Sequence, residues 1–196
     1  LLSFIMSSQN KVKTMTIAGL LSALGILIPM IAPRFMLEPA SYTLASHVPI
    51  YIAMFISLPV AVFVAIVTGI GFFIGFPLVV ALRAFSHIFF VVIGAYVLSK
   101  NKNILNNKVS AFLFVFIISL IHAVSEVIVV SLFYLGGDVI EIYYEKGYFF
   151  SVIVLVGIGT LIHSMLDFII AALVWKPVHK VVSIPVNVNF NKSSTA

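Results

Sequence analysis

The sequence predicts an all-α integral membrane protein, a single bundle of six transmembrane helices with both termini in the cytoplasm. Of its 196 residues, 62% are hydrophobic and only 9% are charged. A soluble domain carries roughly 45–50% apolar and about 25% charged residues. Because one core cannot hide so large an apolar excess, much of the surface must face lipid. The basic residues lie singly between long apolar runs that Pro and Gly interrupt.

The apolar runs and their breakers define the expected elements. They predict helices over residues 12–33, 45–58, 60–75, 78–99, 109–134 and 149–175. Spanning a bilayer takes about 20 residues, with a range near 17–25. The second and third helices are therefore short, and they could form one broken element. We expect a single six-helix domain over residues 1–182, followed by a polar tail over residues 183–196.

The loops carry an asymmetric charge distribution that predicts the orientation. With the N-terminus inside, the cytoplasmic segments hold Lys11, Lys13, Lys100, Lys102, Lys108, Lys176, Lys180 and Lys192. The outer loops hold only Arg34 and Lys146, beside the acidic Glu38, Asp138, Glu141 and Glu145. Excess Lys and Arg in short loops marks the cytoplasmic side, so both termini are predicted to be cytoplasmic.

Ionisable residues occur inside the predicted spans, where a charged or polar group is costly and needs a partner or a function. They form pairs four residues apart, which places both members on one helix face: Arg83 with His87, His122 with Glu126, and His163 with Asp167. His47 adds a polar group near the outer end of the second helix. By depth, Arg83, His87, His122 and Glu126 could line one cavity that opens outward, whereas Asp167 is expected to lie too deep to join it.

These groups have two interpretations. Arg83 and Glu126 could be an ion pair that only braces the bundle, and His122, His163 and Asp167 could serve packing alone. A cluster at similar depth instead suggests a hydrated binding site. Arg83 suits an anionic ligand, because a guanidinium binds a carboxylate through two parallel hydrogen bonds.

The first helix carries small residues at a regular spacing. Ala18 and Ser22, and likewise Gly19 and Ala23, fit the small-xxx-small pattern that allows close helix approach. This surface could pack within the bundle, or it could be a docking face for another membrane subunit.

Several chemistries are not supported by the sequence. The absence of cysteine excludes thiolate chemistry, and no glycine-rich phosphate loop is present for ATP hydrolysis. Zinc-protease and serine-hydrolase motifs are also missing, so neither a metal nor a cofactor is expected in this chain. The scattered basic residues do not form a nucleic-acid patch. Two alternatives stay open: a membrane hydrolase using His47, His87 and Asp167, and a proton-driven permease using His163 and Asp167.

At this point the chain resembles the substrate-binding S component of an energy-coupling factor (ECF) vitamin transporter, over about residues 12–180. The resemblance rests on the size, the six predicted helices, the missing ATPase motif and the helix-1 segment Ile17-Ala18-Gly19-Leu20-Leu21-Ser22-Ala23. Two further segments resemble members assigned to small acidic vitamins. They are Pro39-Ala40-Ser41-Tyr42-Thr43-Leu44-Ala45-Ser46-His47-Val48-Pro49 and Leu82-Arg83-Ala84-Phe85-Ser86-His87.

The resemblance implies a non-enzymatic subunit of an ABC-type importer in the bacterial cell membrane. Its partners would be a transmembrane coupling subunit and two cytoplasmic ATPase subunits, which alone use ATP. The substrate would be a vitamin that bears a carboxylate, with pantothenate the first candidate and niacin the second. The predicted substrate-binding residues are Tyr42, His47, Arg83, His87, His122 and Glu126. The predicted partner-docking residues are Ala18, Gly19, Ser22 and Ala23.

Overall fold

The computed structural model describes residues 2–37, 40–182 and 184–188, and these residues are mostly helical. In chain order the elements are α1 (Leu2–Ile31), β1 (Arg34–Leu37), β2 (Ala40–Thr43), α2 (Val48–Ile56), α3 (Leu58–Gly75), α4 (Leu78–Lys100), a short 3-10 turn η1 (Ile104–Asn106), α5 (Lys108–Gly136), α6 (Glu141–Glu145), a π-helical stretch η2 (Phe149–Ile158) and α7 (Gly159–Val178). The all-α prediction is confirmed. The predicted Glu38 and Lys192 lie outside the described residues.

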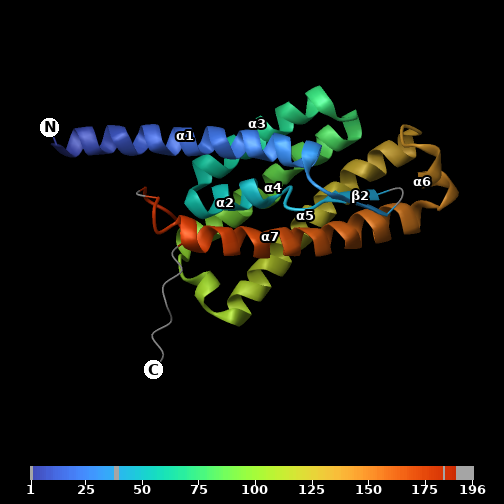
Figure 1. Cartoon of the computed structure of the whole chain (residues 1–196). Coiled ribbons are helices and arrows are strands. Elements are labelled where there is room, and N and C mark those ends of the chain that lie inside the picture. Colours follow the sequence, from blue (N-terminus) through green and yellow to red (C-terminus); the bar gives the residue numbers. More distant parts are fainter. Residues whose placement is uncertain (1, 38–39, 183, 189–196) are drawn as a thin grey trace.

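Within the described ranges, five helices are long and apolar enough to cross a membrane. They cover Ser8–Ile31, Leu58–Gly75, Leu78–Lys100, Lys108–Gly136 and Phe149–Val178, the last combining η2 and α7. The multi-pass prediction is therefore confirmed, but the count of six spans is not. The N-terminal end of α1 and the C-terminal end of α7 lie at the same end of the bundle (Figure 1).

Helix α2 is too short to span a bilayer and forms the centre of the bundle. All nine of its residues are buried, and it packs against α1, α3, α4 and α7. It begins at Val48 with Pro49 in its first turn, a position where proline fits because that N–H has no partner within the helix. It ends at Ser57, whose extended backbone separates α2 from α3.

The predicted start of the second helix at residue 45 is wrong. Residues 44–47 form a turn, in which Ala45 adopts a φ of 64°. Helical propensity alone did not reveal this turn, because it is held by a contact with a residue far away in the sequence, described below.

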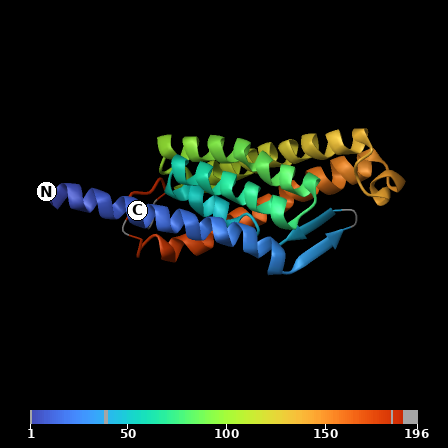
Figure 2. The same ribbon diagram turned by 90° about the horizontal axis from the view of Figure 1, so that it is seen from above.

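The segment predicted as an outer polar loop is a two-stranded antiparallel hairpin, in which Phe35 pairs with Tyr42 and Arg34 with Thr43. Side chains alternate along β2, with Ala40 and Tyr42 buried and Ser41 exposed. Figure 2 shows the hairpin at the end of the bundle that lies away from the N-terminus of α1. Strand β2 therefore covers one end of the helices with its buried face.

The first part of the predicted polar tail packs onto the bundle. Ile184 and Val188 are buried, and the backbone N–H groups of Asn187 and Val188 donate to the carbonyl of Phe55 over 2.9 and 3.1 Å. The indole Nε1 of Trp175 donates to the carbonyl of Val188 over 3.2 Å. Residues 184–188 thus cap the C-terminal end of α2, while residues 189–196 lie outside the described part.

Candidate functional site

A cavity of about 300 Å³ lies beneath the hairpin, between β2, the turn before α2, and the helices α1, α3, α4, α5 and α7. Its volume is at the lower end of the range for small-molecule sites. Its polar wall comes from Tyr42, His47, Arg83, His87, Glu126 and His163, and its apolar wall includes Phe72 and Phe76. Five of the six residues predicted to bind substrate therefore line one partly open cavity.

The sixth predicted residue, His122, lies behind that wall with its side chain fully buried. Its Nδ1 is 3.1 Å from Ser164 Oγ, and its Nε2 is 3.4 Å from Glu126 Oε1. His122 therefore supports lining residues without facing the cavity itself. The role of all six residues in binding stays a prediction.

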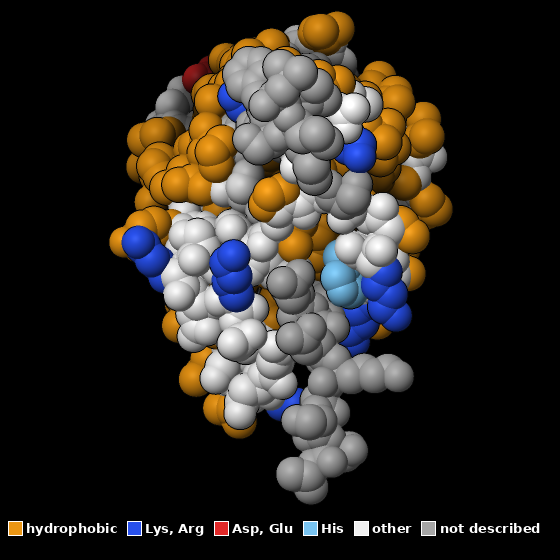
Figure 3. All heavy atoms as spheres, turned by 90° about the vertical axis from the view of Figure 1, so that its left-hand side faces the viewer, with side chains coloured by type: hydrophobic (Ala, Val, Ile, Leu, Met, Phe, Trp, Pro, Cys, Tyr) orange, Lys and Arg blue, Asp and Glu red, His pale blue; other side chains and the backbone are white. Residues whose placement is uncertain are grey.

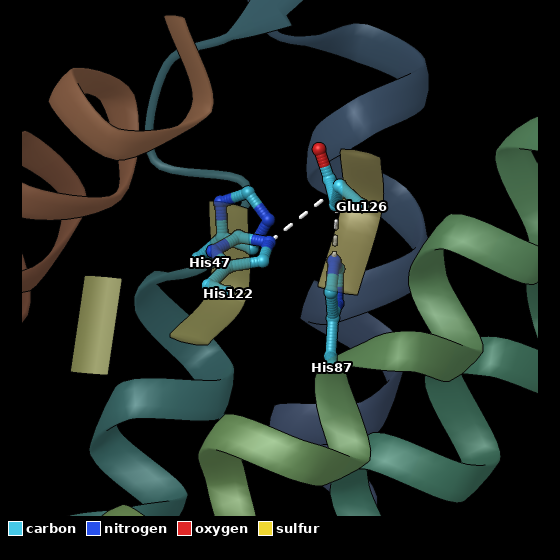
Figure 4. A group of neighbouring side chains, drawn as sticks. All are labelled: His47, His87, His122 and Glu126. Carbon is cyan, nitrogen blue, oxygen red and sulfur yellow. Dashed lines mark ion pairs between the residues drawn. The ribbon is translucent and has the colours of Figure 1, made fainter. Parts of the chain in front are cut away.

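Glu126 is the centre of the first polar group in the cavity wall. Its Oε2 accepts hydrogen bonds from Arg83 Nη2 over 2.7 Å and from Thr160 Oγ1 over 2.6 Å. Its Oε1 faces His87 Nε2 at 3.5 Å and His122 Nε2 at 3.4 Å (Figure 4). Four side chains from three helices thus converge on one buried carboxylate.

Asp167 is the centre of the second polar group and holds the turn before α2. Its Oδ1 accepts from the backbone N–H of Ala45 over 2.8 Å, and its Oδ2 accepts from that of His47 over 2.9 Å. Oδ2 also lies 3.0 Å from His47 Nδ1 and 3.3 Å from His163 Nε2. Because buried backbone N–H groups need partners, this carboxylate stabilises the non-helical turn.

Asp167 is completely buried and does not line the cavity. It is connected to the cavity through His47, a wall residue that it binds. His163 itself lines the cavity, and its Nε2 lies 3.1 Å from Ser46 Oγ. The sequence did not predict either connection.

His47 joins the two polar groups. Its ring lies edge-on to the rings of His87, His122 and His163, with centroids 4.8, 4.7 and 5.1 Å away. His47 therefore contacts Asp167 directly and reaches Glu126 through His87 and His122. The turn that carries His47 is the structural link between the ligand-facing wall and the centre of the bundle.

Tyr42 closes the cavity from the hairpin side. Its hydroxyl donates to the backbone carbonyl of Leu155 in the π-helical stretch η2, where the widened turn leaves backbone groups open to outside partners. Gly159 permits this approach, because a Cβ there would collide with the Tyr42 hydroxyl.

Sequence reasoning missed four polar residues of this region: Thr160, Ser164, Ser46 and Thr68. A signal was available for the first two. Thr160, Ser164 and Asp167 follow one another at spacings of four and three, which places them on one face of α7. Ser46 carried no comparable signal, since its position depends on the turn.

The predicted docking residues of α1 fall on two different faces. Ala18 and Ser22 are buried against the bundle, whereas Gly19 and Ala23 are exposed. The helices are close on the buried side: a Cβ at Gly25 would lie 2.7 Å from Thr68 Oγ1 of α3. The docking prediction is therefore corrected for Ala18 and Ser22, whose small side chains allow α1 to pack on its own bundle. Gly19 and Ala23 remain available to a partner.

The structure is a multi-pass helical bundle with a partly open cavity, lined by apolar and ionisable side chains, at one end. Over 168 residues the chain is 42% identical to the niacin transporter NiaX of Lactococcus lactis subsp. cremoris, an alignment that covers 84% of this chain and 74% of the relative. No family model matches the chain, and no solved structure matches it.

The chain therefore belongs to the S components of ECF vitamin transporters, the family that its sequence resembles. It is a multi-pass transport protein of the bacterial membrane and not an enzyme. The hydrolase alternative is thereby set aside.

Proposed function

We propose that this chain is the high-affinity substrate-binding subunit for niacin in an ECF-type importer. The observation that carries the proposal is the 42% identity to a niacin transporter over most of the chain. Niacin was the second candidate from the sequence, and it now replaces pantothenate as the first. The cavity supports the choice, because its volume of about 300 Å³ suits a small ligand better than a long flexible one.

The proposed ligand is recognised at both of its chemical parts. Niacin is an aromatic ring that bears one carboxylate. Phe72 and Phe76, whose rings stack with centroids 4.5 Å apart, offer an apolar surface for the ring. Arg83 offers the carboxylate a guanidinium, and it would share that guanidinium between Glu126 and the ligand.

We further propose that six segments cross the membrane, with both termini in the cytoplasm and the cavity on the outer side. The sixth crossing would consist of β2, the turn at residues 44–47, and α2. Basic side chains on the end of the molecule that holds the N-terminal end of α1 support this orientation (Figure 3). That end includes the helix-terminal Lys100, Lys108 and Lys176.

Energy for uptake would come from other proteins, namely a transmembrane coupling subunit and two cytoplasmic ATPase subunits. The exposed stripe of Gly19 and Ala23 on α1 is the proposed contact with the coupling subunit. The permease alternative would instead need proton transfer through His163 and Asp167. Asp167 favours a structural role, because both of its oxygens already accept backbone N–H groups.

Titration calorimetry on the purified chain tests the niacin proposal. Nicotinate should bind, nicotinamide should bind much more weakly because it lacks the charge, and pantothenate should bind weakly or not at all. Proteoliposomes that contain this chain alone should bind nicotinate without concentrating it. Tight pantothenate binding without nicotinate binding would refute the assignment, and concentrative uptake under a proton gradient would favour the permease.

A further inference from the structure

Three imidazoles and one carboxylate meet at and directly behind the cavity wall in an arrangement typical of metal ligands. One ring nitrogen from each of His47, His87 and His122, together with one oxygen of Glu126, lie within 4.8 Å of one another, and all four residues are buried. Figure 4 shows His87 and His122 directed at Glu126, with His47 beside His122. The four side chains come from the turn before α2, from α4 and from α5.

The distances fit coordination better than hydrogen bonding. Glu126 Oε1 lies 3.4 Å from His122 Nε2 and 3.5 Å from His87 Nε2, whereas N–H···O bonds are usually about 2.7–3.2 Å long. Among the described residues, both of these buried nitrogens lack a hydrogen-bond partner. Ligands held about 2.0–2.1 Å from a tetrahedral zinc ion lie roughly 3.3–3.4 Å from one another, which is close to the separations between Glu126 Oε1 and the two histidine nitrogens.

Neighbouring side chains bind the other ring nitrogen of His47 and His122 and the other oxygen of Glu126, so one atom of each is directed at the proposed ion. Asp167 binds His47 Nδ1 at 3.0 Å, and Ser164 binds His122 Nδ1 at 3.1 Å. Metal-bound histidines commonly use their second ring nitrogen in this way, which fixes the tautomer and orients the ring. Arg83 and Thr160 occupy only Oε2 of Glu126, so Oε1 is the oxygen turned toward the histidines.

We propose that His47, His87, His122 and Glu126 bind one divalent first-row transition metal ion, with zinc the best fit to three imidazoles and a carboxylate. Imidazole ligands suit zinc, copper, iron and nickel, and they disfavour magnesium and calcium. This departs from the expectation that the chain holds no metal. The sequence concealed the site because its ligands are spread over three separate segments.

The ion would also complete the charge of the cavity, a step that rests on the proposed niacin function. Among the residues that line the cavity, Arg34 and Arg83 carry two positive charges and Glu126 carries one negative charge. With neutral histidines the wall therefore holds a single net positive charge, and Glu126 already engages Arg83. A divalent ion adds two positive charges beside Arg83, so nicotinate should bind more tightly to the metal-loaded protein.

The test uses the full chain, purified through a tag without histidine, stripped with a chelator and titrated with Co²⁺. We expect one Co²⁺ per chain by elemental analysis, visible absorption bands typical of tetrahedral nitrogen and oxygen ligation, and displacement of Co²⁺ by Zn²⁺. His87→Asn and His122→Asn should each weaken Co²⁺ binding at least about tenfold, since loss of an outer partner alone typically costs 10–100-fold. His179→Gln, a change outside the cluster, should leave Co²⁺ binding unchanged.

The possible outcomes distinguish three claims: the metal site, its effect on ligand binding, and the proposed function. Folded protein that takes up no Co²⁺, or variants that bind Co²⁺ as well as the parent, would overturn the metal site. If His122→Asn fails to fold, His87→Asn at the cavity wall decides the question. Equal nicotinate affinity with and without metal would overturn only the link to the ligand, and absence of nicotinate binding in both forms would overturn the proposed function while leaving the metal result intact.

Discussion

The carboxylate of Asp167 binds both the backbone N–H and the ring Nδ1 of His47, a residue 120 positions earlier in the chain. This double contact stabilises the turn at residues 44–47, which precedes α2 and contributes His47 to the cavity wall. It also makes Asp167 a stabilising residue whose effect on ligand binding is indirect.

Asp167→Asn should destabilise the protein strongly. An asparagine keeps one acceptor oxygen, but its NH2 group would face a backbone N–H that now donates to the carboxylate, so two donors would oppose each other. Hydrogen bonds to a charged group typically contribute about 1.5–3 kcal/mol each. Thermal unfolding in detergent, followed by circular dichroism, should show a clear drop in the midpoint, whereas the exposed Asp138→Asn should not. An unchanged midpoint for Asp167→Asn would mean that the turn is held by other contacts.

Arg83→Lys should weaken nicotinate binding while the bundle stays folded. Lysine keeps the charge near Glu126 but loses the planar fork that can contact two carboxylates at once. Losing a buried charge-assisted contact costs about 2–5 kcal/mol, which calorimetry would detect easily. Arg34→Lys is the matched comparison, because the Arg34 guanidinium already donates to the carbonyl of Pro29 over 2.9 Å. Equal effects of the two changes would remove the special role of Arg83.

Gly159→Ala should loosen the hairpin over the cavity. The new methyl group would occupy the place of the Tyr42 hydroxyl and break its bond to Leu155. We expect faster release of nicotinate in stopped-flow measurements, and a smaller effect in the same direction for Tyr42→Phe, which removes only the hydroxyl. Gly19→Ala is the control, since a Cβ there meets nothing within 4 Å. Release rates that match the parent in both cavity variants would show that the hairpin does not retain the ligand.

Leucine substitutions on the two faces of α1 should affect different properties of the protein. Ala18→Leu with Ser22→Leu puts bulk between α1 and its own bundle, so folding and ligand binding should both suffer. Gly19→Leu with Ala23→Leu alters only the exposed stripe, so nicotinate binding should persist while co-purification with a coupling subunit is lost. If this second pair still assembles and transports, the stripe faces lipid and the partner binds elsewhere.

The sequence predicted most of the long helices well. Hydrophobic runs placed the helices over residues 78–99 and 109–134 within two residues of α4 and α5. Spacing of four within a helix also placed His122 beside Glu126 and His163 beside Asp167. These features depend on local periodicity, which a single sequence displays directly.

The parts that escaped prediction depend on contacts between distant segments. The turn at residues 44–47 is stabilised because Asp167 accepts hydrogen bonds from its backbone N–H groups. Strands β1 and β2 pair with each other, but the sequence shows no recognisable turn signal for a hairpin. The grouping of His47 with His87 and His122 depends likewise on how three segments pack. The two faces of α1 could not be distinguished either, because small residues occur on both and only packing decides which one is covered.

The segment at residues 184–188 and the cavity lie at opposite ends of α2. Helix α2 is nine residues long, so it measures about 13 Å. One end holds the carbonyls that Asn187 and Val188 cap, and the other begins beside His47. A fusion or truncation placed before Val188 would therefore remove the groups that cap α2 at the end opposite His47.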